Sequence, residues 1–256
     1  MELCKSLCAG ICLLFTSGLL QASTLNSGDI QFVGYQADNP DTFAFVSWTE
    51  LDASTQITFT DNGWLADGGF RSGEGELFWT AGQAIAAGSL VIIGDSVSVG
   101  SVTGSLGLSS SGDQLFAIDG MSGDLITGIQ MNGAWDVDAT SAGTSALPPD
   151  ISADLLNFFI SPERDNAVYT GPFSGLDINV YRQTIDDPAN WVSSNASVDF
   201  SGLRDFSIPV ETGRAAVSSP KTLVLLLSGL LLLGWVSGKR QLFAGNRLAC
   251  FSVSCN

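Results

Sequence analysis

The chain has 256 residues, 45% of them hydrophobic, which is enough for one or two folded domains. Its formal net charge of −16 would repel a phosphate backbone and argues against nucleic acid as a partner. Histidine is absent, which excludes a Ser-His-Asp arrangement, His-containing metal sites and the usual general base at neutral pH.

Residues 1–22 have the order of a secretory signal peptide. Lys5 precedes the apolar run 7–20, and the small residue Ala22 follows as a cleavage point. The mature chain is therefore expected to begin at Ser23. An N-terminal core helix and acylation at Cys12 are the two alternatives. No cysteine lies between residues 13 and 249, so disulfides do not hold the exported part together.

The body of the chain is punctuated like an all-β protein. Short runs rich in β-branched and aromatic residues alternate with Gly, Asn, Asp and Ser. They predict strands within 29–35, 41–48, 56–62, 76–82, 89–95, 113–119 and 124–130. In the third run Ile57 and Phe59 alternate with Thr58 and Thr60, as in a strand with one face in water. The second run is apolar on both faces and is expected centrally between two layers, so the fold class is an all-β sandwich.

The order of four motifs resembles the lamin-tail family of exported bacterial proteins. They are "FVGYQADNPDTFAFVSW", the Gly-Trp turn "TDNGW", the strand "AIAAGSLVII" and "SSSGDQLFAID", all within 29–130. The resemblance implies an immunoglobulin-like sandwich over 23–147, with binding or structural roles more often than catalysis. The segment 65–79 is longer than a minimal member of the family would have.

Clustered oxygen ligands are the main candidates for chemistry. Asp61, Asn62 and Asp67 stand in the Gly-rich stretch "TDNGWLADGG", and calcium takes six to eight oxygens from such side chains and from backbone carbonyls. The alternative is that they are turn residues that cap their own backbone. Asp136 with Asp138, and Asp186 with Asp187, are further acidic pairs.

Other catalytic readings are weaker. Glu74 and Glu76 form a spaced carboxylate pair of the type that hydrolyses glycosides, although Gly75 between them indicates a loop. Ser111 has no histidine or lysine base in its motif. Trp64 and Trp79 could stack on sugars, but tryptophan at a strand end is more often in the core.

After residue 147 the pattern changes. A Ser, Gly and Pro-rich connector leads into 148–217, whose apolar residues are too few for a separate core. We expect a mostly irregular or helical extension packed on the sandwich. A helix is predicted over 176–185 with Ile178, Tyr181 and Ile185 on one face, ending before Pro188, and Trp191 is expected to anchor the extension.

The segment 218–240 is an apolar run between basic residues. Its uncharged part covers 17 residues, about 25 Å of helix, which is a short transmembrane span. A soluble core helix would carry polar residues on one face, and this run does not. Residues 23–219 hold 25 acidic residues and no lysine, whereas four of the chain's ten basic residues flank or follow the run. By the positive-inside rule, the tail 241–256 is expected in the cytoplasm.

Pro220, a leucine-rich helix, and Lys239 with Arg240 resemble the PEP-CTERM sorting signal of Gram-negative bacteria. Ser218 and Ser219 stand where that family has its first two residues. The resemblance implies an exosortase-like enzyme as a processing partner. The sequence therefore predicts a non-enzymatic cell-surface or extracellular-matrix protein without a cofactor, tethered by its C-terminal helix until processed, with polysaccharide as a candidate partner. The alternative is a hydrolase of extracellular polysaccharide that uses calcium or acidic residues.

Overall fold

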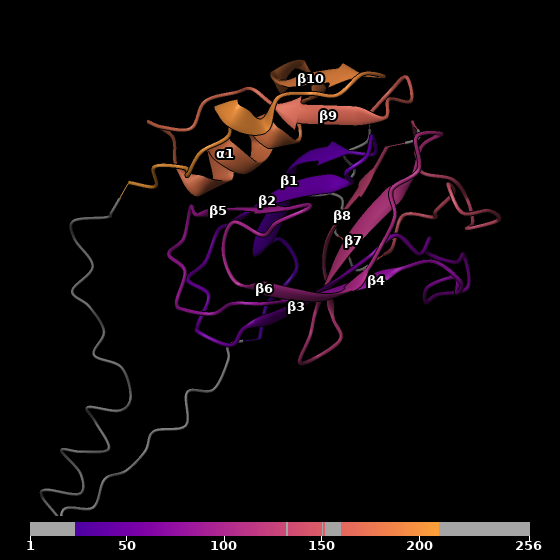
Figure 1. Ribbon diagram of the computed structural model, residues 1–256, viewed down its shortest axis with the longest axis horizontal. Helices are drawn as coiled ribbons and strands as arrows, with labels where there is room; N and C mark the ends of the chain where they lie inside the picture. Colours follow the sequence, from indigo (N-terminus) through magenta and orange to yellow (C-terminus); the bar gives the residue numbers. More distant parts are fainter. Residues whose placement is uncertain (1–23, 132, 150, 152–159, 210–256) are drawn as a thin grey trace, which may run out of the picture. The chain divides into compact units, whose positions relative to one another are not determined.

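The fold consists mainly of two antiparallel sheets of five strands each (Figure 1). The computed structural model describes residues 24–131, 133–149, 151 and 160–209. The first sheet has the order β10-β9-β1-β2-β5 and the second the order β6-β4-β3-β7-β8. The strands of the first sheet are β1 (Ile30–Gln36), β2 (Thr42–Ser47), β5 (Leu90–Ile93), β9 (Asn166–Tyr169) and β10 (Trp191–Ser194). Those of the second are β3 (Gln56–Thr60), β4 (Glu76–Thr80), β6 (Ser101–Ser105), β7 (Gln114–Asp119) and β8 (Leu125–Gln130).

The two sheets pack face to face through aromatic rings. Phe43 of β2 lies 4.8 Å from Phe59 of β3, and Phe45 lies 5.6 Å from Trp79 of β4, measured between ring centroids. All four side chains are buried. Their position between the sheets follows from the alternation of side chains along each strand, which sends every second residue inward. All seven predicted strands are confirmed, and so is the all-β class.

The outer face of β2 is covered rather than wet, as its apolar pattern predicts. Trp48, just after β2, stacks on Tyr181 of α1 (Ile178–Ile185) with the centroids 6.0 Å apart, and Phe206 packs edge-on against both rings. Figure 1 shows α1 over β1 and β2. The predicted helix is confirmed with Tyr181 and Ile185 buried, and it begins two residues later than expected because Asp177 caps its first N–H groups.

The outer face of the second sheet has a smaller apolar cluster of its own. Trp64 and Phe70 form an isolated antiparallel β-bridge at the start of the long 65–79 segment. The ring centroid of Phe70 lies 5.3 Å from that of Phe116 of β7. Trp135 covers the same ring at 5.7 Å. Gly128 of β8 leaves room for the ring, since a Cβ there would lie 2.5 Å from it. The long segment is therefore a cover for the sheet.

Residues 160–209, the larger described part of the segment 148–217, differ from the mostly irregular or helical extension that the sequence suggests. β9 pairs with β1, and β10 pairs with β9, so two of its strands complete the first sheet. The short 3-10 helices η1 (Pro188–Asn190) and η2 (Phe200–Gly202) connect and follow them. Trp191 is buried and donates its indole N–H to the carbonyl of Ile185, 2.7 Å away, which is the expected anchoring role.

One further expectation is wrong. Thr60 does not face water: it is 1% exposed, and its hydroxyl donates to the carbonyl of Gly75 and accepts from Asn62. The loop that leads into β4 covers Thr60 at Gly75. The alternation of residues within β3 does not show that another loop covers its outer face. The sequence does not predict β6, because "SVTGS" has little apolar content.

Several sequence predictions lie outside the described residues. These are the signal peptide 1–22, the sorting segment with Pro220, Lys239 and Arg240, and the tail 241–256. Within the described ranges, no helix has the length and apolar character needed to cross a membrane.

Candidate functional site

Asp61 and Asn62 serve the backbone of the loops around them. Asp61 Oδ1 accepts the N–H of Gly75 at 2.6 Å, and its Oδ2 accepts the N–H of Gly107 at 3.0 Å. Asn62 Oδ1 accepts the N–H of Glu74 at 3.1 Å. Both residues are buried. Each of these three oxygens therefore already has a backbone N–H group as a partner.

Asp67 is exposed at the tip of the Trp64–Phe70 hairpin, whereas Asp61 and Asn62 are buried at the end of β3. Asp138 accepts the N–H of Ala66 at 2.9 Å, and Asp187 caps η1. Among the residues that the structure describes, no group of three or more Asp, Glu, Cys or His side chains is arranged to hold a metal ion. Several carboxylates of the described residues, including Asp61, Asp138 and Asp187, accept hydrogen bonds from loop backbone.

The other candidates also take up local roles. Glu74 lies 3.3 Å from the guanidinium of Arg71, and burial together with the charge of Asp61 raises its pKa. Glu76 is an exposed residue of β4. Trp79 is fully buried and donates its indole N–H to the carbonyl of Val99, so it belongs to the core and cannot stack on a sugar. Trp64 is part of the smaller apolar cluster.

Three carboxylates hold the loop between β6 and β7 by three consecutive backbone N–H groups. Gly107 donates to Asp61, Leu108 to Asp41 Oδ2 at 2.9 Å, and Ser109 to Asp113 Oδ2 at 2.8 Å. We call Asp41, Asp61 and Asp113 the carboxylate clamp. Hydrogen bonds from N–H groups to a carboxylate are stronger than neutral ones, so the clamp fixes a loop that has no ladder partner.

Burial raises the pKa values of two carboxyls of the clamp, Asp113 and Asp41. It raises the pKa of Asp113 to about 8, against the opposing effect of the N–H groups of Ser109 and Gln114, while the charges of Asp61 and Glu74 add to the rise. Burial also raises the pKa of Asp41, and the N–H of Leu108 opposes that change. The charge of Asp61 raises the pKa of both Asp41 and Asp113.

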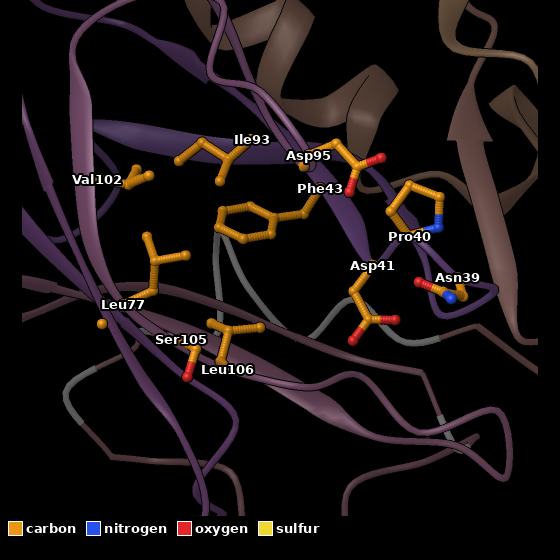
Figure 2. Close-up of a pocket in the computed structure, with 12 residues that line it drawn as sticks. Asn39, Pro40, Asp41, Phe43, Leu77, Ile93, Asp95, Val102, Ser105 and Leu106 are labelled. Carbon is orange, nitrogen blue, oxygen red and sulfur yellow. The ribbon is translucent and has the colours of Figure 1, made fainter.

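A pocket of about 500 Å³ opens beside the clamp, between the edge strands β5 and β6 (Figure 2). This volume is within the roughly 300–1,000 Å³ that small-molecule sites occupy. Apolar side chains from both sheets form part of the lining: Phe43, Leu77, Ile93, Val102 and Leu106. We call it the β5–β6 pocket. In Figure 2 the ring of Phe43 stands among Ile93, Leu77 and Leu106.

Most of the polar groups stand on one side of the pocket, whereas Ser105 lies on the other side beside Leu106 (Figure 2). Asn39, Asp41 and Asp95 contribute an amide and two carboxylates, and Ser105 adds a hydroxyl. Figure 2 shows Asp41 and Asp95 on the same side as Pro40. Asp95 is exposed and Asp41 is half-buried. The pocket thus combines an apolar surface with hydrogen-bonding groups and negative charge, and it has no basic residue in its lining.

The sequence did not bring these residues together. Asp41 and Asn39 lie in the Asn-Pro turn that supports the lamin-tail resemblance, and Asp95 ends the run "SLVIIGD", but they are separated by more than fifty residues and meet only at the open side of the sandwich. Comparisons of the chain with protein-family models, with curated proteins and with solved structures found no match. The interpretation of the site therefore depends on its geometry and chemistry.

Proposed function

We propose that this is an exported cell-surface or extracellular-matrix protein that binds polysaccharide in the β5–β6 pocket and carries out no catalysis. The observation that carries the proposal is the pocket, which sits at the open side between two well-packed sheets. Its floor is part of a rigid core, since Phe43 and Ile93 are 2% and 1% exposed. A binding site on such a floor is pre-organised and loses little entropy on binding.

A sugar matches the two kinds of surface in this pocket. A pyranose ring has apolar C–H faces and a rim of hydroxyl groups. The apolar faces would pack on the half-buried Leu77 and Leu106, above the ring of Phe43, and the hydroxyls would donate to the carboxylates or pair with the Asn39 amide. The negative lining disfavours sugars that carry carboxylate or phosphate groups.

The location in this proposal comes from the sequence. An acidic body without lysine or internal cysteine stands between a signal-peptide pattern and an apolar run with basic flanks. We propose that 218–240 tethers the protein in the membrane until an exosortase-like enzyme recognises Pro220, Lys239 and Arg240. The lamin-tail-like, immunoglobulin-like form of the sandwich is part of the same proposal, supported by the order of the strand motifs.

A glycan array probed with the full chain in detergent tests the binding function. We expect signals from neutral or amino glycans, and weaker ones from glycans rich in uronic acids. Leu77→Trp, which fills the pocket from a half-buried position, should remove the signals, whereas the exposed Val137→Trp should keep them. A blank array with the folded full chain contradicts the proposal.

Intact-mass analysis of the protein from its native envelope tests the location. A chain that begins at Ser23 supports export, and one that ends near Pro220 supports processing. Recovery of the chain from the cytosol with residues 1–22 still attached contradicts both.

A further inference from the structure

We infer that the sugar unit held in the β5–β6 pocket carries a free amino group, whose ammonium lies against Asp41 and Asp95. This inference rests on the proposed saccharide binding and names the class of sugar. It is drawn from the charges around the pocket rather than from its shape.

The pocket has two carboxylates and no protein cation to pair with them. Its lining includes Asp41 and Asp95 but neither arginine nor lysine. Within the described residues, the one ion pair joins Arg71 to Glu74, and neither lines the pocket. The negative charge at this site is therefore available to a ligand.

Asp41 is held in place before any ligand arrives. Its Oδ2 accepts the N–H of Leu108 at 2.9 Å, which fixes the carboxylate at the pocket wall. Burial raises the pKa of Asp41, and an adjacent ammonium would favour the charged form of this carboxylate. A charge-assisted hydrogen bond to a fixed carboxylate is stronger than a neutral hydrogen bond, because its geometry and its charge both favour it.

Asp95, which follows β5, is the second carboxylate that favours an ammonium group in the pocket. It is exposed, so its own contribution to binding is screened by water and salt. The apolar floor beside these two carboxylates favours a ligand with a ring or carbon skeleton over a hydrated inorganic cation. An aminated sugar has both features in one unit.

Two tetrasaccharides with the same linkage test the inference by calorimetry on the full chain. A β-1,4-linked glucosamine tetramer carries an ammonium group on C2 of each sugar unit. A β-1,4-linked glucose tetramer carries a hydroxyl group on the same carbon and is otherwise the same. We expect the glucosamine tetramer to bind about tenfold tighter, the size expected from one favourable charge-assisted contact.

The variant Asp41→Asn/Asp95→Asn removes both charges and keeps an acceptor oxygen for the N–H of Leu108. It should lower the glucosamine preference to about twofold or less while the glucose tetramer binds as before. The matched control Glu50→Gln/Asp67→Asn also removes two negative charges, at exposed positions that do not line the pocket. It should keep most of the preference. Asp95→Asn alone, at an exposed position, serves as a variant that preserves the clamp.

The outcomes separate the inference from the proposed function. Equal affinity for the two tetramers overturns the inference and leaves the saccharide function standing. An equal loss of preference in the pocket variant and the matched control also overturns it, because the preference would then come from net charge. Binding of neither tetramer, together with a blank glycan array, overturns the proposed function itself.

Discussion

Two sets of carboxylates lie next to each other in this sandwich: one set binds backbone N–H groups, and the other lines the β5–β6 pocket. Asp61 and Asp113 are buried, and their oxygens accept hydrogen bonds from backbone N–H groups of neighbouring loops. Asp95 is exposed at the pocket and Asp41 belongs to both sets, with one oxygen on the loop. The comparison shows that acidic composition alone does not say what a carboxylate binds: Asp61 and Asp113 bind backbone N–H groups, whereas Asp41 and Asp95 line the pocket.

The largest expected effect is on stability at Asp61. Asp61→Ala leaves the N–H groups of Gly75 and Gly107 without their acceptor. An unpaired donor held away from water costs about 1–3 kcal/mol, and Gly75 is half-buried while Gly107 is exposed, so we expect a loss of about 2 kcal/mol. Urea unfolding of the full chain measures it. Asp61→Asn keeps one acceptor oxygen and should lose about half as much. A change below about 1 kcal/mol for the alanine variant would show that the two loops hold without the clamp.

The second effect is on the pH dependence of stability and concerns Asp113. Burial raises its pKa from 3.8 to about 8 in the folded protein, so folding favours the protonated form. Its stabilising contribution is complete below pH 4 and is lost as the pH rises towards 8. The free energy of unfolding should therefore decline over this range, with Asp41, Glu74 and Asp186 contributing in the same direction since burial raises each of their pKa values.

Asp113→Asn should flatten that decline, because the amide does not titrate. Unfolding by urea at pH 4, 6 and 8 for both proteins gives the two slopes. The residual slope of the variant belongs to the other buried carboxyls. Identical slopes for the two proteins would mean that Asp113 is ionised throughout, held by the N–H groups of Ser109 and Gln114.

Asp41 should give a smaller effect on stability and a clear effect on binding. Asp41→Ala removes one acceptor from a half-buried loop, worth about 1 kcal/mol, and also removes a charge from the pocket. Asp41→Asn should restore most of the stability but not the affinity for an aminated sugar. A variant pair in which stability and affinity change together would show that Asp41 acts only through the loop.

The smallest effect on stability is expected at Asp95. It is exposed, so Asp95→Asn should change the free energy of unfolding by less than about 0.5 kcal/mol. Any loss of affinity for the glucosamine tetramer in this variant is then a direct effect on the ligand. Unchanged affinity would assign the preference to Asp41 alone.

Particular elements show how far sequence reasoning reached. The seven strands with strong β patterns and the helix at Tyr181 follow from periodicity and were predicted in place. β6 and β9 were missed because "SVTGS" and "NAVY" are short and weakly apolar, and they are strands because β4 and β1 offer open edges to them. Asp61 and Asn62 were correctly singled out as unusual, but their role is to bind backbone N–H groups.

By itself, the sequence determined the class of the fold, the apolar faces of its main strands and the helix in the C-terminal half. These depend on the spacing of neighbouring residues, which the chain carries locally. Only the tertiary structure decided which oxygens serve the backbone and which face the pocket. The partners of these oxygens depend on four loops that meet beside the pocket: β1–β2, β3–β4, the loop after β5, and β6–β7. Residues far apart in the chain acquire such partners only when the sheets pack.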